Sequence, residues 1–334
     1  MIKLLLSLPN WLLILLSRKK QIQLGERKLH APFQLLLKLT ENMVTNWENI
    51  TPEEFRAYYL QQNSMSSEFP SSIDWKDHKV EVEDSTITVR EYFSNSISDK
   101  SAALVYFHGG GWVIGDLETH HQLTGLLCEK LDARIFSVDY RLSPEFKFPI
   151  PLEDCEKAYE WVINNSDSLN VDKNKISAGG DSAGGNITAA LCLKRRDEGK
   201  VLPKMQLLFY PVTDLHLKKD SIDECAEGFF LTKEAMIWFR KHYLNSLEEI
   251  HNPLVSPLLS QDLSGLPPAI VSTAGFDPLR DEGDEYANKL LSSGNKVFHQ
   301  ENEGFVHGFA NMSYIPGVPE ALDEICLNLK EMMN

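Results

Sequence analysis

"GGDSAGGN" (residues 179–186) is the stretch that decides the fold, because it sets Ser182 between small residues on both sides. Its centre, "GDSAG", fits the pattern G-x-S-x-G. The apolar "KIS" before it predicts a strand, and "NITAALCLKRR" after it has the spacing of a helix. A serine on a sharp strand-to-helix turn has an exposed hydroxyl, and flanking glycines let such a turn be tight. Ser182 is therefore a candidate nucleophile, provided that the rest of the chain supplies its partners.

The composition narrows the class of protein. The chain has 334 residues, of which 43% are hydrophobic and 24% charged, so we expect a packed core. The net charge of −15 argues against a nucleic-acid partner, because phosphate contacts need clustered Lys and Arg. Five widely spaced cysteines without a C-x-x-C pair indicate a reduced, cytoplasmic protein and no zinc site.

Outward from Ser182, short apolar strands alternate with helices, a rhythm that predicts an α/β fold with a mostly parallel sheet. In such a sheet, ligands bind beyond the carboxyl ends of the strands. The predicted strands are a hairpin over 80–93, then 102–107, 134–140, "KISAG" (175–179), 205–211, 268–275 and 296–300, and the predicted helices are 119–131, 151–164, 186–196 and 281–292.

Two segments do not follow this rhythm. The first, residues 1–75, is predicted to be mostly helical with no strand. The second, about 212–255, contains the amphipathic stretch 231–244, whose helix is expected to start at Thr232. We expect both to form a helical cap over the sheet, with residues 76–334 as the catalytic domain around the second cap segment.

The N-terminus combines apolar and basic residues. Residues 1–40 carry seven Lys or Arg against Glu26 alone, and the apolar run Leu4 to Ser17 contains Pro9. This run is shorter than the roughly 20 residues that a membrane span needs. An amphipathic helix packed on the protein is the favoured interpretation. Peripheral contact with an anionic membrane through Trp11 and the basic cluster stays open, as does a signal peptide.

A serine nucleophile needs a histidine base, and the base needs a carboxylate that orients it. His307 in "EGFVHGF" follows the last strand, where a base is expected, and Asp277 in "AGFDPLRDEG" directly follows a buried strand. Asp281 and Glu282 are alternatives to Asp277, but we expect them at a helix start, where the dipole favours acidic groups. The other histidines considered are less well placed: His120 and His121 before Ser182, His242 in the cap and His299 inside a strand.

Acyl transfer also needs N–H donors where negative charge develops. "HGGG" (108–111) follows a buried strand and offers the backbone of Gly109, Gly110 and Gly111, of which the last two are preferred. With the N–H of Ala183 they make a candidate oxyanion hole. His108 is expected to organise the loop rather than to act as a second base.

These motifs carry a resemblance to a family. "YFHGGGWVIGD", "DYRLSPEFKFP", "GGDSAGGN", "FDPLRDEG" and "EGFVHGF" resemble the hormone-sensitive-lipase-like esterases (bacterial family IV) of the α/β-hydrolase fold. The N-terminal "IQLGERKLHAPFQLLLKL" and "GFFLTKEAMIWFRKHYL" resemble parts of the family's helical cap. The resemblance implies hydrolysis of carboxylic esters by Ser182, Asp277 and His307, without metal or cofactor.

The substrate is expected to be a small, apolar ester with a short to medium acyl chain, because aromatic residues would line a covered pocket. The candidate linings are Trp112, Phe229, Phe230, Trp238 and Phe276. Three alternatives stay open: an amidase or deacetylase with the same triad, a ligand receptor without turnover, and a membrane-associated lipid hydrolase. A homodimer is also left open.

Overall fold

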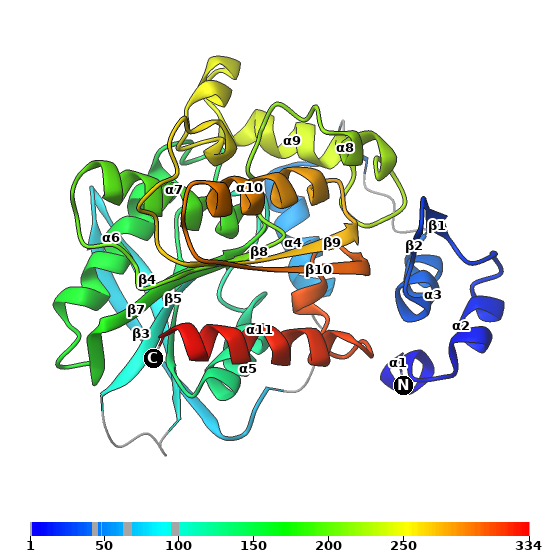
Figure 1. Cartoon of the computed structure of the whole chain (residues 1–334), viewed down its shortest axis with the longest axis horizontal. Coiled ribbons are helices and arrows are strands. Elements are labelled where there is room, and N and C mark those ends of the chain that lie inside the picture. Colours follow the sequence, from blue (N-terminus) through cyan, green and yellow to red (C-terminus); the bar gives the residue numbers. More distant parts are fainter. Residues whose placement is uncertain (1, 42–45, 48, 63–68, 95–99, 334) are drawn as a thin grey trace.

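The predicted α/β architecture is confirmed by the computed structural model, which describes residues 2–41, 46–47, 49–62, 69–94 and 100–333. Its centre is an eight-stranded sheet with the strand order β10-β9-β8-β7-β5-β6-β4-β3 (Figure 1). The strands are β3 (Ile73–Val82), β4 (Ser85–Ser94), β5 (Ser101–Phe107), β6 (Arg134–Asp139), β7 (Val171–Asp181), β8 (Gln206–Phe209), β9 (Ala269–Phe276) and β10 (Val297–Val306).

The sheet is parallel from β10 to β6, and its other edge is antiparallel. β3 and β4 form the predicted hairpin, in which Val82 pairs with Ser85, and β4 pairs with β6. Of the parallel strands, β5, β6, β8 and β9 are almost fully buried and rich in Val, Ile, Leu, Ala and Phe, as expected for strands covered on both faces, whereas β7 is continuously buried only from Ile176 onward. Their carboxyl ends meet at one edge, where the motifs of the sequence come together.

Helices cover both faces of the sheet. α5 (His121–Leu131) and α11 (Val318–Met333) pack on one face, and α6 (Ile150–Asn164), α7 (Ala183–Asp197) and α10 (Arg280–Ser292) cover the other (Figure 1). Leu104, Tyr106 and Ile135 contribute to the core under α5 and α11, whereas Val105 and Phe136 face the core under α6 and α7. Successive side chains of a strand point to opposite faces of the sheet, so β5 and β6 each contribute residues to both cores.

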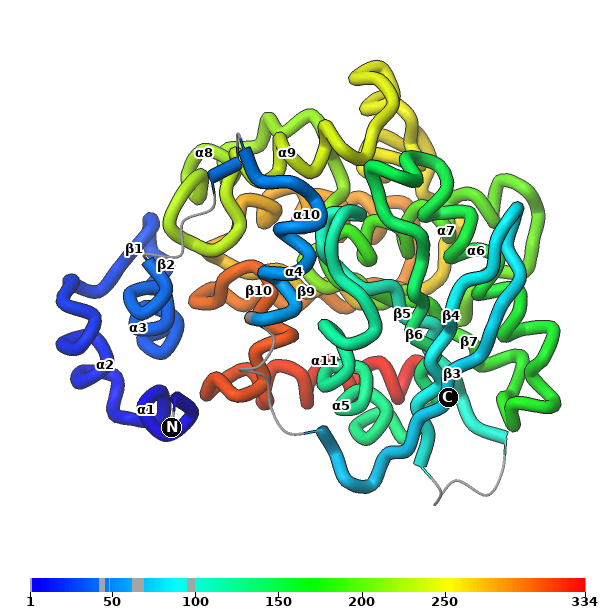
Figure 2. The backbone as a smooth tube through the Cα atoms, turned by 180° about the vertical axis from the view of Figure 1, so that it is seen from behind, coloured from blue at the N-terminus to red at the C-terminus, as the bar shows by residue number. Residues whose placement is uncertain are grey.

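Smaller helices gather beyond the carboxyl end of the sheet. Figure 2 shows α4 (Pro52–Gln62) next to α9 (Lys233–Tyr243) on this side of the molecule, with α3 (Ala31–Thr40) beyond them. Thr232 caps α9 by accepting a hydrogen bond from the N–H of Ala235, at the predicted start. The remaining elements here are α8 (Asp220–Glu224) and the 3₁₀ turns η2 (Leu247–His251), η3 (Pro257–Leu259) and η4 (Phe309–Asn311).

The N-terminal segment differs from the prediction in two ways. The apolar run forms two short helices, α1 (Ile2–Leu6) and α2 (Asn10–Leu16), instead of one, because Pro9 has no N–H and restricts the residue before it. The prediction that this segment contains no strand is also wrong, because β1 (Gln23–Leu24) and β2 (Arg27–Lys28) form a small hairpin. The predicted segment 1–75 also includes residues outside the described part, at 1, 42–45, 48 and 63–68.

Candidate active site

The serine motif forms the strained turn that its glycines predict. Ser182 joins β7 to α7 with φ 54° and ψ −115°, a conformation that non-glycine residues rarely adopt. A Cβ at Gly180 would lie 2.3 Å from the carbonyl oxygen of Phe107, and one at Gly184 only 1.9 Å from the same atom. Glycine is required on both sides because the turn packs directly against the end of β5.

Ser182, His307 and Asp277 meet beyond the ends of three different strands. The Nε2 atom of His307 lies 3.0 Å from the Oγ of Ser182, and its Nδ1 lies 2.8 Å from the Oδ2 of Asp277. Asp277 is fully buried, and its Oδ1 accepts a hydrogen bond of 2.8 Å from the N–H of Leu279. The carboxylate is thus fixed at both oxygens, and the imidazole bridges it to the hydroxyl.

The alternative acids lie elsewhere. Asp281 accepts a hydrogen bond from the N–H of Ser221, and Glu282 accepts one from the N–H of Thr213. Both stand in the first turn of α10, as expected, where an acidic group is favoured. Glu282 is fully buried, and burial raises its pKa well above the ordinary value. Neither contacts His307 through any hydrogen bond between described residues.

The predicted oxyanion donors divide into two groups. The N–H of Gly109 donates to the Oδ1 of Asp181 at 3.0 Å, so its inclusion in the oxyanion hole was wrong. Gly110 (φ 114°) and Gly111 (φ 58°) adopt positive φ angles, and Ala183 opens α7, where an N–H has no partner within the helix. Among the hydrogen bonds of the described residues, none uses the N–H of Gly110, Gly111 or Ala183.

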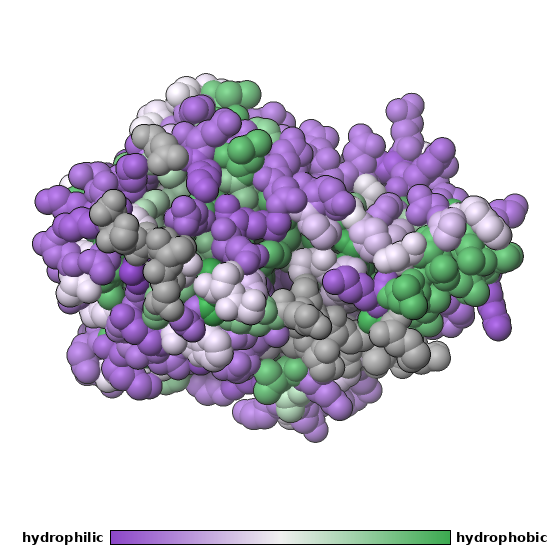
Figure 3. Space-filling view, turned by 90° about the horizontal axis from the view of Figure 1, so that it is seen from below, coloured by the Kyte–Doolittle hydropathy of each residue, from purple (hydrophilic) through white to green (hydrophobic). Residues whose placement is uncertain are grey.

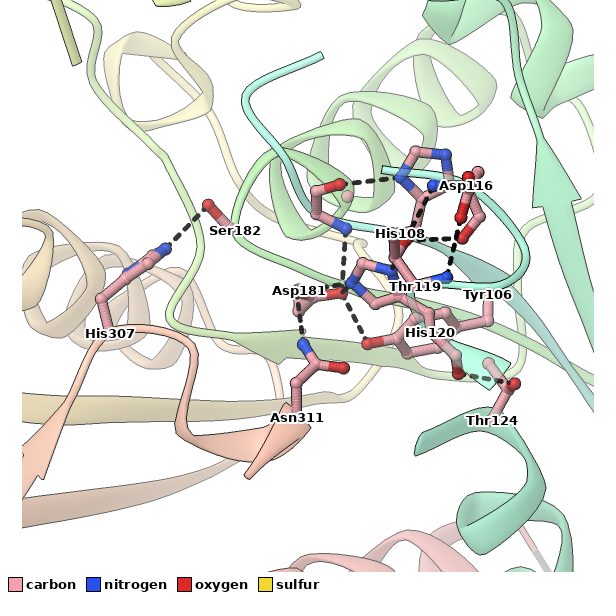
Figure 4. Close-up of polar contacts among 12 residues, drawn as sticks. Tyr106, His108, Asp116, Thr119, His120, Thr124, Asp181, Ser182, His307 and Asn311 are labelled. Carbon is pink, nitrogen blue, oxygen red and sulfur yellow. Dashed lines mark hydrogen bonds and ion pairs between the residues drawn. The ribbon is translucent and has the colours of Figure 1, made fainter. Parts of the chain in front are cut away.

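Asp181, the variable residue of the G-x-S-x-G pattern, organises the loop behind the site. In Figure 4 its side chain points away from that of Ser182. Its Oδ1 also accepts a hydrogen bond of 2.8 Å from the Tyr106 hydroxyl, and its Oδ2 lies 3.3 Å from the Nε2 of His120. Sequence reasoning missed this residue, although a carboxylate between two glycines and the nucleophile is a signal that could have found it.

The charge of Asp181 is held in a fully buried position. Burial alone would raise its pKa, but the neighbouring His120 and the Tyr106 hydroxyl outweigh that effect and leave the pKa of Asp181 below its ordinary value. An ionised carboxylate accepts hydrogen bonds at both oxygens and donates none. Asp181 therefore remains an acceptor for the N–H of Gly109 and anchors the glycine loop.

His108 organises the same loop, as predicted. Its Nδ1 lies 2.7 Å from the carbonyl oxygen of Gly109, and its ring stacks on that of Tyr140. The Nε2 atom is buried and has no hydrogen-bond partner among the described residues. Burial, followed by the neighbouring His120, lowers the pKa of His108 to about 4, because both disfavour the charged ring.

Because the ring of His108 is buried, we expect the stability of the fold to fall at acidic pH. The unfolded chain binds a proton at His108 below about pH 6.5, whereas the folded state favours the neutral ring down to about pH 4. Its contribution to stability is therefore complete above pH 6.5 and is lost as the pH falls toward 4. We expect the free energy of unfolding to drop by on the order of 2–3 kcal/mol between pH 7 and 4.5 from this group.

Urea unfolding at a series of pH values measures this effect. The variant His108→Asn keeps an N–H for the carbonyl of Gly109 but cannot take up a proton, so its stability should depend less steeply on pH over this range. Equal pH dependence in both proteins would show that His108 is not the responsive group.

A cavity of about 730 Å³ ends at this site, and both Ser182 and His307 contribute to its wall. Residues of α3, α4 and α9 line much of the rest, together with the glycine loop and the segments around 212–217 and 227–231. The aromatic members of the wall are Trp47, Phe55, Tyr58, Tyr59, Trp112, Phe230, Phe239 and Tyr314. A mostly apolar space above a polar, hydrogen-bonded floor suits a small apolar molecule with one reactive polar group.

Two of the five predicted lining residues lie on this wall, Trp112 and Phe230. The other three belong to the core. Phe229 packs on Phe276 with ring centroids 5.3 Å apart, and Trp238 packs in the cluster of Phe55. The spacing of aromatics along a helix does not reveal which of them face a cavity, and here Phe239, next to Trp238, is the one that does.

The chain is similar to known proteins over most of its length. A family model described as "alpha/beta hydrolase fold" matches residues 104–311. The carboxylic ester hydrolase LipN of Mycobacterium tuberculosis is 42% identical over 220 residues, which cover 64% of this chain and 58% of LipN. An arylesterase of Saccharolobus solfataricus is 38% identical over 235 residues, covering 70% of this chain and 76% of that enzyme.

Solved structures agree with the sequence relatives. A thermostable esterase from Pseudomonas putida superposes with a TM-score of 0.86 at 31% identity, covering 90% of this chain and 97% of the other. The match extends beyond the sheet into most of the surrounding helices, since nine-tenths of the chain is included. The chain therefore belongs to the hormone-sensitive-lipase-like carboxylic ester hydrolases (bacterial family IV) of the α/β-hydrolase fold.

Proposed function

We propose that this protein is a serine carboxylesterase that hydrolyses short- to medium-chain esters through an acyl-enzyme intermediate. The observation that carries this proposal is the hydrogen-bonded series Asp277–His307–Ser182 at the floor of an apolar cavity. The N–H groups of Gly110, Gly111 and Ala183, which no hydrogen bond among the described residues uses, support it. The esterase relatives support the reaction class, and the geometry supports the role of each residue.

The first half of the reaction acylates the serine. His307 takes the proton from the Oγ of Ser182 on its Nε2 atom as the oxygen attacks the ester carbonyl. Asp277 stabilises the imidazolium through Nδ1. Negative charge on the carbonyl oxygen is met by the N–H groups of Gly110, Gly111 and Ala183, and His307 returns the proton to the departing alcohol.

The second half regenerates the enzyme. A water molecule gives its proton to His307 and attacks the acyl carbon, and the same N–H groups stabilise the second tetrahedral intermediate. Collapse of that intermediate releases the acid and returns the proton to Ser182. Each oxygen that gains or loses a proton does so through the Nε2 atom of His307, 3.0 Å from the serine.

The cap determines which acyl chains fit. Phe55 from α4 and Phe239 from α9 pack with ring centroids 6.0 Å apart, and Trp47 lies 5.1 Å from Phe55. Phe239 covers the glycine loop, since a Cβ at Gly111 would lie only 2.2 Å from its ring. We propose that this aromatic cover limits the acyl chain to short and medium lengths.

Turnover of p-nitrophenyl esters of increasing acyl length tests the proposal. We expect kcat/KM to be highest for short to medium chains, with butyrate well above palmitate, because a long chain exceeds the covered space. Faster hydrolysis of a palmitate emulsion than of the butyrate would contradict the pocket assignment. Parallel assays with p-nitroacetanilide distinguish an amidase, for which the anilide would be cleaved at a rate comparable to the ester.

A further inference from the structure

Exposed apolar side chains gather on α1 and α2. Leu4 is 79% exposed, Trp11 68% and Leu15 66%. Trp11 and Leu15 are four residues apart and share one face of α2, whereas Leu13 on its other side is fully buried in the core that α3 joins. Figure 3 shows apolar surface concentrated at this end of the molecule. We call Leu4, Trp11 and Leu15 the N-terminal apolar patch.

Positive charge surrounds the patch, although the chain as a whole carries −15. Two basic groups of this region are neutralised: Arg27 pairs with Glu224 at 2.7 Å, and Lys38 pairs with Glu41. The others form no ion pair with any described residue, and all of them are exposed. They are Lys3, Arg18, Lys19, Lys20 and Lys28.

We propose that α1, α2 and the basic segment after them bind the surface of an anionic lipid bilayer, with the apolar patch inserted at the headgroup boundary. Trp and Leu side chains partition into that boundary, and Lys and Arg are attracted by anionic headgroups. Each contribution is modest, and stable attachment takes both. Attachment would be peripheral, as no helix of the described residues is long and apolar enough to cross a membrane.

The charge pattern favours a bilayer over a second copy of the chain as the occupant. In a symmetric dimer built on this patch, the same surface of each protomer meets its equivalent. The unpaired basic residues of one protomer would then face those of the other, and like charges at an interface oppose association. An anionic bilayer neutralises all of them at once.

The basic segment after the patch reaches the cavity and would affect how a substrate enters it. This step rests on the proposed ester hydrolysis. Lys19, three residues beyond the end of α2, is part of the cavity wall. The other exposed members of that wall are Glu41, Glu227, Gly228, Phe230 and Glu234. The opening thus lies beside the segment that we assign to the bilayer surface, and an ester dissolved in the bilayer would have a short path to Ser182.

Flotation of the full chain with vesicles tests the binding directly. We expect the protein to float with phosphatidylcholine vesicles that contain about 30% phosphatidylglycerol, and to be released at about 1 M salt, where charges are screened within roughly 3 Å. The double variant Trp11→Ser/Leu15→Ser should lower the partition coefficient at least about tenfold. Lys3→Gln/Lys20→Gln should lower it by roughly tenfold or more.

A matched control removes exposed leucines far from the patch. Leu291 and Leu327 are 58% and 60% exposed, and Leu291→Ser/Leu327→Ser should bind like the wild type. All variants should hydrolyse water-soluble p-nitrophenyl butyrate at the wild-type rate, so membrane binding and ester hydrolysis can fail separately. The proposal is overturned by absence of binding to anionic vesicles, by equal binding to phosphatidylcholine alone, or by a dimer in light scattering that Trp11→Ser/Leu15→Ser dissociates.

Discussion

Ser182→Ala is expected to lower kcat for p-nitrophenyl butyrate by roughly 10⁴- to 10⁶-fold. In the proposed mechanism this hydroxyl attacks the ester and forms the acyl-enzyme, so its removal stops the first step. The fold should survive, because the turn is held by its backbone: the N–H of Ser182 donates to the carbonyl of Phe209 at 2.9 Å. The Oγ atom contacts only His307 among the hydrogen bonds of the described residues.

Two further measurements make this result specific to the nucleophile. Ser264→Ala, at an exposed serine remote from the cavity, should leave kcat unchanged. A phosphonate ester should modify the wild type once, on the peptide that contains Ser182, and should not modify Ser182→Ala. Activity that survives in Ser182→Ala, or labelling of another residue, would assign the nucleophile elsewhere and exclude the proposed acyl-enzyme.

The fold and the approach of the three reactive residues could be predicted because both depend on local, periodic features. Each of Ser182, Asp277 and His307 directly follows a strand of the sheet, and the strands concerned, β7, β9 and β10, run in the same direction. Parallel strands end at one edge, so the order of the motifs along the chain already places their side chains together.

Contacts between distant segments could not be predicted in the same way. The N–H of Gly109 donates to Asp181 because the glycine loop and the serine turn pack together. The spacing of residues within either motif does not reveal this packing. Phe55 faces the cavity from α4, and Phe229 does not, although both are aromatic residues in predicted cap segments. Which face of a short cap helix is covered depends on its tertiary partners rather than on its own pattern.

Asp277→Asn is expected to lower kcat about 10⁴-fold at neutral pH. An asparagine at this position can still accept the N–H of Leu279 through its oxygen, so the loop after β9 should keep its shape. Its amide nitrogen would then face the Nδ1 atom of His307 and donate to it. The imidazole would carry its proton on Nε2 instead, where it could not accept the proton of Ser182.

Asp281→Asn is the matched control, because it makes the same chemical change four residues away, in the first turn of α10. Its carboxylate contacts Arg280 and the N–H of Ser221 rather than His307, so kcat should stay close to that of the wild type. Thermal unfolding of both variants shows whether either loss reflects instability. A large loss of kcat in folded Asp281→Asn together with an active Asp277→Asn would show that the orienting carboxylate lies in α10. The assumption that this acid must directly follow a strand would then be wrong.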